Sequence, residues 1–283
     1  MRVAVTGGSG KIGRAAIAAL RAAGHKMVNF DIKPSPDGAR TLPVNVADFG
    51  EILGALSGID TVAGPPDAVL HLAGIPAPGL APDHVIFENN VQSTYNVFSA
   101  CQRLGIKRIV WASSETLLGL PFITPPDFAP IDETHPDRPE WSYSLSKQVG
   151  ETIAKAFSRW DADASVTSLR FSNVFEPSDY SNMAPIHAHP APRRMNLWSY
   201  IDARDAGEAC RLALENAATG HEAMIIAAAD TLMDRPSADL MAEFFPLTPL
   251  RPGLSGFQSL LSSARAESRI RFRPVHSWRA AAT

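Results

Sequence analysis

The chain has 283 residues, of which 45% are hydrophobic and 19% are charged, and its formal net charge is −3. This composition is ordinary for a globular protein, and the weak negative charge gives no reason to expect a nucleic acid or an anionic membrane as a partner. Its two cysteines are too few for a disulfide framework, which favours a cytoplasmic protein, and no apolar run is long enough to predict a membrane span.

A glycine-rich stretch follows the first predicted strand, 2–5, and opens a predicted helix at 14–23. The first glycine of its G-x-x-G-x-x-G pattern permits a tight turn, the second lets the backbone approach a ligand, and the third lets the helix pack on the strand. Free N–H groups and the helix dipole would then attract a pyrophosphate. The residues predicted to bind a dinucleotide here are Gly7, Ser9, Gly10, Lys11, Ile12 and Gly13.

An acidic residue, Asp31, follows the second predicted strand, 27–30. It lies at about the distance from the glycine loop, roughly 20 residues, at which an acid holds the adenosine ribose of a dinucleotide. Its carboxylate would accept hydrogen bonds from the ribose hydroxyls and repel a 2′-phosphate. The sequence therefore predicts NAD rather than NADP as the cofactor.

Strand-length apolar segments alternate with helical patterns along most of the chain. Strands are predicted at 2–5, 27–30, 40–44, 68–72, 108–112, 165–171 and 223–228, and a clear helical pattern covers 90–104. Such alternation predicts βαβ crossovers and a doubly wound parallel α/β sheet. Ligands of these sheets bind beyond the carboxyl ends of the strands, where the glycine loop, Asp31, Ser114 and Asn173 fall.

The T-G-x-x-G-x-x-G form of the loop resembles the short-chain dehydrogenase/reductase superfamily, in particular its extended, epimerase/dehydratase-like branch. The resemblance implies a Rossmann domain at 1–174, completed by roughly 198–228, and a small substrate lobe made of 175–197 and 229–283. It also implies a homodimer in which the helix after Asn90 and the helix that carries Tyr143 pair with those of a second copy.

A segment after the third predicted strand resembles the family's adenine site. Asn45 stands where the family has an acid, and its amide can still hydrogen-bond the adenine edge, while Val46 is the accompanying apolar residue. Asp48, two positions on, is equally well explained as a helix N-cap.

The fourth predicted strand ends in a segment that resembles the family's H-x-A-G turn. Leu72, Ala73 and Gly74 are therefore expected to line the cofactor, whereas His71, on an apolar strand, is expected to be a core histidine. Asn90 resembles a structural asparagine of the family, and a plain helix N-cap is the alternative.

Tyr143 and Lys147 are four residues apart on one face of a predicted helix. The lysine ammonium and a positive nicotinamide would favour the phenolate, so Tyr143 could take the proton of a substrate hydroxyl while a hydride leaves the same carbon. The pair Ser113-Ser114, followed by Gly119, resembles the family's S-S-x-x-x-x-G. That resemblance makes Ser114 the third catalytic residue and gives Ser113 a role in supporting the cofactor.

The substrate is expected to lie between Ser114 and Tyr143 and to face the segment 176–198. The predicted substrate residues are Pro76, Glu115, Asn173, Arg193 and Arg194. The arginines could hold a carboxylate, which favours an acidic sugar over a neutral polyol, and surface solvation is the alternative role for them. No metal is predicted, because the histidines of this segment have no partner ligands.

Three functions share these features. The first is an NAD-dependent dehydrogenase of a sugar, a uronate or a related sugar acid, similar to uronate dehydrogenases. The second is a nucleotide-sugar epimerase, against which the short segment 178–199 argues. The third is a non-catalytic NAD-sensing protein, against which the Ser114, Tyr143 and Lys147 set argues. Dehydration is disfavoured, because the Thr-Asp-Glu of family dehydratases is Ser-Glu-Thr here.

Overall fold

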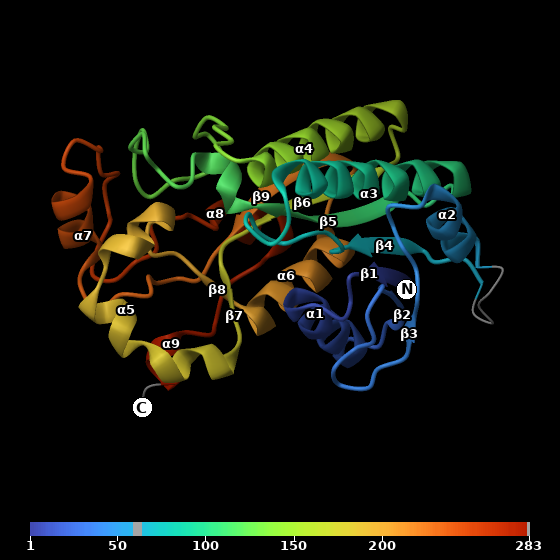
Figure 1. Cartoon of the computed structure of the whole chain (residues 1–283), viewed down its shortest axis with the longest axis horizontal. Helices are drawn as coiled ribbons and strands as arrows, with labels where there is room; N and C mark the ends of the chain where they lie inside the picture. The colour runs from blue at the N-terminus through green and yellow to red at the C-terminus, as the bar shows by residue number, and fades with distance from the viewer. Residues whose placement is uncertain (59–63, 282–283) are drawn as a thin grey trace.

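The computed structural model describes residues 1–58 and 64–281. Within these residues, seven parallel strands form one sheet in the order β3-β2-β1-β4-β5-β6-β9 (Figure 1). The strands are β1 (Arg2–Thr6), β2 (Lys26–Phe30), β3 (Thr41–Leu42), β4 (Ala68–His71), β5 (Arg108–Ser114), β6 (Ser165–Phe171) and β9 (Gly220–Ile226). The predicted doubly wound parallel sheet is confirmed. Its strand order reverses between β1 and β4, and such a switch point is where ligands of these folds bind.

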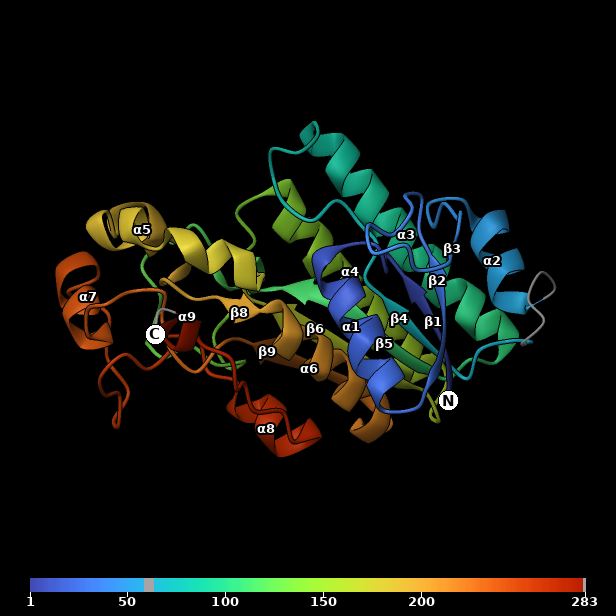
Figure 2. The same cartoon turned by 90° about the horizontal axis from the view of Figure 1, so that it is seen from below.

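Helices cover both faces of the sheet, as Figures 1 and 2 show. One face carries α2 (Phe49–Ser57), α3 (Asp83–Leu104) and α4 (Ser142–Trp160). The other carries α1 (Lys11–Ala22), α6 (Ala203–Asn216) and α8 (Ala264–Ile270). Glycine allows the closest approaches: a Cβ at Gly150 would lie 2.5 Å from the Trp111 ring, and one at Gly207 would lie 2.5 Å from the backbone of Ala15. Both faces are therefore tightly packed.

A smaller group of elements lies beyond the carboxyl ends of the strands (Figure 1). It contains the strand pair β7 (Val174–Phe175) and β8 (Ile201–Asp202), the 3-10 helices η2 (Pro177–Asn182) and η3 (Ala191–Asn196), and the helices α5 (Ala184–Ala188), α7 (Ser237–Phe244) and α9 (Trp278–Ala281). These elements enclose two apolar clusters of their own. The division into domains stays a prediction, and α8, within the segment assigned to the small lobe, packs on α6.

Several predicted boundaries were wrong. The last strand, predicted at 223–228, is Gly220–Ile226. The first helix begins at Lys11, directly after the N-cap Gly10, and the third strand is only Thr41–Leu42. The helix expected from Asn90 begins at Asp83, because the chain leaves its proline-rich loop with Pro82 at the N-cap. Asn90 is therefore not an N-cap but a buried residue in the middle of α3. In the described part of the chain, no helix is both long and apolar enough to span a membrane.

Candidate active site

The glycine loop lies at the switch point, between the ends of β1 and β4. Gly7 has φ +72°, and a Cβ there would lie 2.5 Å from the Ala73 nitrogen. A Cβ at Gly13 would lie 2.3 Å from the Gly7 oxygen, so α1 could not pack this closely on the loop with a larger residue. A Cβ at Gly10, by contrast, would lie 3.4 Å from the nearest described atom outside its chain neighbours, the Gly7 oxygen. Gly7 and Gly13 thus serve packing, while Gly10 leaves the loop open to a ligand.

The start of α1 fits the phosphates of a dinucleotide. Its N-cap, Gly10, makes no side-chain capping bond, and no acidic residue lies in the first turn. The first turn itself therefore offers the Lys11 and Ile12 N–H groups neither a capping side chain nor a carboxylate of its own, which suits an anion. NAD would be held by this turn through its pyrophosphate.

The predicted ribose acid is fixed beside the loop. Asp31 Oδ2 accepts from the Ser9 nitrogen at 3.0 Å, and Oδ1 accepts from the Lys33 nitrogen at 3.0 Å. The Ser9 hydroxyl donates to the Lys33 oxygen at 2.9 Å. These bonds hold a partly exposed carboxylate at the edge of the glycine loop, where a ribose could reach its remaining lone pairs.

The expected adenine segment follows β3. Asn45 is exposed, and its Oδ1 accepts from the Ala47 nitrogen at 3.1 Å, while Val46 is buried. Asp48 caps α2 by accepting from the Glu51 nitrogen at 3.0 Å, which confirms the N-cap interpretation.

The turn after β4 is held against the glycine loop and α3. Leu72 donates its N–H to the Thr6 oxygen at 2.9 Å, which sets Ala73 and Gly74 beside Gly7. Asn90, which lies within α3, accepts from the Ile75 nitrogen at 2.8 Å and donates to the Ile75 oxygen at 3.0 Å. Asn90 therefore has a structural role.

His71 is a core residue, as predicted. Its side chain is buried, and Nδ1 lies 2.8 Å from the Thr6 hydroxyl. Burial lowers the pKa of His71 to about 3, so the ring is neutral at physiological pH.

Tyr143 and Lys147 lie in the first turns of α4, against the end of β5, and both are buried. Lys147 Nζ donates to the Ala112 oxygen at 2.8 Å and lies 5.6 Å from the centre of the Tyr143 ring. Burial lowers the pKa of Lys147 to about 8. Ser114 is at the end of β5, and its Oγ accepts from the Thr116 nitrogen at 3.2 Å and the Thr116 hydroxyl at 3.0 Å.

The protein groups alone raise the pKa of the phenol, whereas the prediction combined the Lys147 ammonium with a positive nicotinamide. Burial raises the pKa of Tyr143 to about 12, a hydrogen bond with Ser114 opposes this rise, and the charge of Glu115 adds to it. The sequence shows a lysine four residues away but not how completely the helix packing would desolvate the phenol. The protein groups around Tyr143 therefore favour its protonated form.

Ser113 points to the other side of β5, toward α4. Its hydroxyl donates to Glu151 at 2.7 Å, and Glu151 also accepts two bonds of 2.8 Å from Arg170. Arg170 pairs further with Asp137 at 2.9 Å. Sequence reasoning missed this buried network, although Glu151 follows Lys147 by one helical turn and so shares its face.

The predicted substrate residues separate into two groups. Glu115 is 4% exposed and lies near Tyr143, and Arg193 reaches toward it while donating to Asn173 Oδ1 at 2.9 Å. Arg194 is exposed on the surface, and Pro76 is an exposed loop residue. The structure thus brings together Glu115, Asn173 and Arg193, and it does not place Arg194 with them.

The start of the segment 176–198 is anchored to α1. Arg14 pairs with Glu176 at 2.6 Å and Lys11 pairs with Asp179 at 2.8 Å, which joins η2 to the first turn of α1.

Within the described residues no cluster of three or more His, Cys, Asp or Glu side chains could hold a metal ion.

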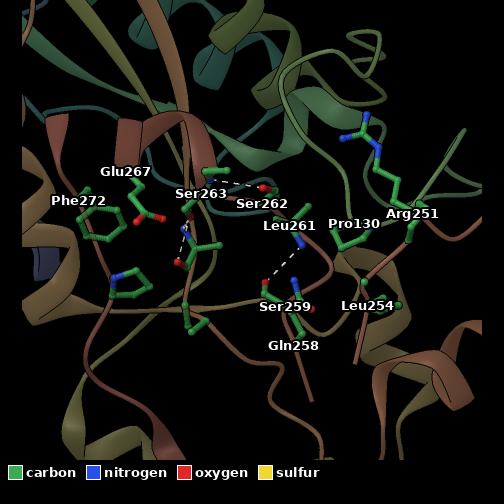
Figure 3. A pocket seen from close by; sticks show the side chains of 17 residues that line it. Pro130, Arg251, Leu254, Gln258, Ser259, Leu261, Ser262, Ser263, Glu267 and Phe272 are labelled. Atoms are coloured by element: carbon green, nitrogen blue, oxygen red, sulfur yellow. Dashed lines mark hydrogen bonds between the residues drawn. The ribbon is translucent and has the colours of Figure 1, made fainter. Parts of the chain in front are cut away.

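A cavity of about 500 Å³ lies elsewhere in the small lobe (Figure 3). Its lining includes Pro130, Arg251, Ser259, Ser263 and Glu267, and it contains none of the predicted site residues. Several of its polar groups have partners in the protein, as when Ser263 donates to the Ala227 oxygen and Glu267 accepts from Arg273. Because it holds none of the predicted site residues, this cavity is not the candidate active site.

The fold, the glycine loop and the Tyr143–Lys147 pair together are typical of an NAD-binding α/β enzyme. The model of the "NAD dependent epimerase/dehydratase family" matches residues 3–227. The chain belongs to this family, the extended short-chain dehydrogenases/reductases. Its members include NAD-dependent dehydrogenases and epimerases, and NAD is the cofactor.

Curated relatives are dehydrogenases and epimerases of sugars. The chain is 28% identical over 225 residues to an NAD-dependent glucose-6-phosphate dehydrogenase of Haloferax volcanii, an alignment covering 74% of this chain and 79% of the relative. It is 29% identical over 229 residues to a UDP-glucose 4-epimerase of Neisseria meningitidis, covering 75% and 64%. A uronate dehydrogenase of Pseudomonas syringae is 28% identical over 189 residues, covering 65% and 63%. The epimerase and the uronate dehydrogenase are thus matched over less than two thirds of their length.

Solved structures share the fold. A short-chain dehydrogenase/reductase superfamily protein from Agrobacterium tumefaciens with bound NAD has a TM-score of 0.75 at 23% identity, covering 99% of this chain and 94% of that one. A mutated uronate dehydrogenase has a TM-score of 0.70 at 20% identity, covering 99% and 83%.

Proposed function

We propose that this protein is an NAD-dependent dehydrogenase that acts at a hydroxyl-bearing carbon of a sugar, a uronate or a related sugar acid. The observation that carries the proposal is the convergence of Ser114, Tyr143 and Lys147 at the end of β5, beyond the switch point that holds the glycine loop. NAD, when bound, accepts the hydride.

Ser114 and Tyr143 would have different roles in the proton transfer. Ser114 would hydrogen-bond the reacting oxygen, and Tyr143 would accept the proton of the substrate hydroxyl. Burial holds the pKa of Tyr143 at about 12 even with Lys147 in place, so the phenol would need the positive charge of the bound cofactor in addition to act as a base near neutral pH. Lys147 is the cation that α4 provides, 5.6 Å from the ring.

The short segment 176–198 supports a dehydrogenase over an epimerase of nucleotide sugars. Tyr180 donates to the buried Asp202 at 2.8 Å, and Trp198 donates to the Pro190 oxygen at 2.7 Å. These bonds fold the segment onto itself and onto the core, so little of it is left to enclose a nucleotide diphosphate. Epimerisation, and NAD sensing without turnover, remain the alternatives that the test must separate.

The test is incubation with NAD and a panel of hexoses, uronates, aldonates and polyols. Net reduction of NAD identifies a dehydrogenase, whereas an isomerised sugar without net reduction identifies an epimerase. NAD binding without either product would support the sensing alternative. Tyr143→Phe should lower kcat by roughly 10²–10⁴ while NAD still binds. The control is Tyr95→Phe, which removes a hydroxyl from a half-exposed ring outside the site. A Tyr143→Phe enzyme with normal kcat would overturn the mechanism.

A further inference from the structure

Glu115 is a buried carboxyl group that the proposed proton transfer does not use. It follows Ser114 directly and begins the 3-10 helix η1 (Glu115–Leu118). Oε2 accepts from the Ser172 hydroxyl at 2.5 Å, and Oε1 accepts from Asn196 Nδ2 at 3.2 Å. Three separate segments, after β5, after β6 and in η3, therefore meet at one carboxyl group beside the catalytic phenol.

Arg193 of η3 is linked to this carboxyl through Asn173, whose side chain accepts from Arg193 and whose backbone donates to Glu115. Its guanidinium lies 5.1 Å from the centre of the Phe175 ring and donates to Asn173, and it is half-buried. Burial raises the pKa of Glu115 to about 7, and hydrogen bonds from Ser172 and Asn196 and the charge of Arg193 oppose this rise. Burial lowers the pKa of Arg193, and Glu115 opposes that change in turn.

The remaining neighbours of Glu115 are known from each element packed against it. Tyr143 faces it from α4, Ser172 and the backbone of Asn173 from the end of β6, and Asn196 from η3. Arg193 is thus the cation placed to balance an ionised Glu115. A substrate carboxylate that bound Arg193 would bring a second negative charge into the same buried space, where two ionised carboxylates are strongly disfavoured.

We propose that Glu115 determines the charge preference of the substrate site: ionised, it neutralises Arg193 and accepts hydrogen bonds from neutral sugar hydroxyls, and an anionic substrate binds only as Glu115 takes up a proton. This inference rests on the proposed function, because it places a sugar-type substrate between Tyr143 and Arg193. Arg193 is then a substrate-binding residue whose availability Glu115 controls.

The expected consequence is a pH dependence that differs between two substrates. If only the protonated form of Glu115 admits an anion, KM for a hexuronate should rise with pH, up to about tenfold per pH unit above neutrality. KM for the matching neutral hexose should not rise in this way, because its hydroxyls can donate to the ionised carboxylate. The enzyme should therefore prefer the hexuronate at low pH and the neutral hexose at high pH.

The decisive experiment compares Glu115→Gln with the full-length wild type, using glucuronate and glucose, or the uronate and hexose that the panel shows to be oxidised. The variant should lose the pH dependence of KM for the uronate and lower that KM at least tenfold near pH 8. Glu133→Gln is the matched control, since Glu133 is a buried carboxyl that accepts from the Ile225 nitrogen and pairs with Arg265, outside the site. It should change neither KM.

Arg193→Gln gives an independent measurement should Glu115→Gln fold poorly. It should raise KM for the uronate, with a smaller effect on the hexose, because it removes the cation while Glu115 still titrates. An unchanged ratio of uronate KM to hexose KM in both variants, in an enzyme that still oxidises a sugar, would overturn this inference alone. Failure to oxidise any sugar of the panel would overturn the proposed function, and this inference with it.

Discussion

Two alanine substitutions in the glycine loop should separate cofactor binding from folding. Gly13→Ala places a Cβ 2.3 Å from the Gly7 oxygen and 2.5 Å from the Gly8 Cα, and neither backbone atom can move without opening the loop. Gly10→Ala places its Cβ 3.4 Å from the Gly7 oxygen, at φ −77° and ψ 173°, a conformation that alanine adopts freely.

The magnitudes follow from these distances. Overpacking at Gly13 should lower the free energy of unfolding by about 1–3 kcal/mol. Gly10→Ala should change it by less than about 0.5 kcal/mol. Gly10 is exposed at the N-cap of α1, where we expect the phosphates to approach, so the added methyl group should crowd them. Losing one charge-assisted hydrogen bond there, about 1.5–3 kcal/mol, would raise Kd for NAD roughly 10- to 100-fold.

Thermal unfolding and calorimetric titration with NAD measure the two effects separately. Gly54→Ala is the control, because Gly54 lies within α2 and its Cβ would meet no described atom within 4 Å outside its own helix. It should stabilise the protein by about 0.5–1 kcal/mol and leave NAD binding unchanged. Normal NAD affinity in Gly10→Ala, or wild-type stability in Gly13→Ala, would refute the division of roles among these glycines.

Other parts of the molecule give further expectations. Arg170→Met leaves Glu151 buried without its main partner and should cost about 3–5 kcal/mol in urea unfolding; a loss below about 1 kcal/mol would show that the network does not hold β6 to α4. Titration should show tighter binding of NAD than of NADP, because the Asp31 carboxylate lies where a 2′-phosphate would come, and the reverse order would exclude that role. Tyr95 on α3 and Trp160 on α4 are 47% and 57% exposed, so sedimentation should give a homodimer, and a 30.4 kDa species alone would refute it.

The features predicted correctly depend on short stretches of sequence. The glycine loop needs only a strand, a turn and a helix in order, and Tyr143 and Lys147 share a helix face because of their spacing. The alternation of strands and helices was enough for the parallel sheet, since a helical crossover is the connection that two parallel neighbouring strands need. Helix starts were less certain, and α3 shows why: Pro82 begins it well before the apolar pattern becomes clear.

The features that escaped prediction depend on burial and on contacts between distant segments. The pKa of Tyr143 rises because packing desolvates the phenol, and no local pattern reports that. Glu115 meets Ser172 and Asn196, which are 57 and 81 residues away along the chain. Arg193 and Arg194 are adjacent in the sequence and were predicted to act together, yet η3 turns the first toward Glu115 and leaves the second in solvent.

Glu176 shows how such distant contacts give a meaning to a departure from the family pattern. Residues 170–177 resemble the family's R-x-x-N-V-x-G-P motif, and Glu176 stands at the position of its glycine. The Glu176 side chain pairs with Arg14 at 2.6 Å, beside the Lys11–Asp179 pair. Glycine could not make this contact, and Arg14 also donates to the Ser9 oxygen of the glycine loop at 2.8 Å. The segment that carries Arg193 toward the substrate is therefore fastened to the turn that holds the cofactor. A change in the glycine loop should for this reason disturb substrate binding as well as NAD binding.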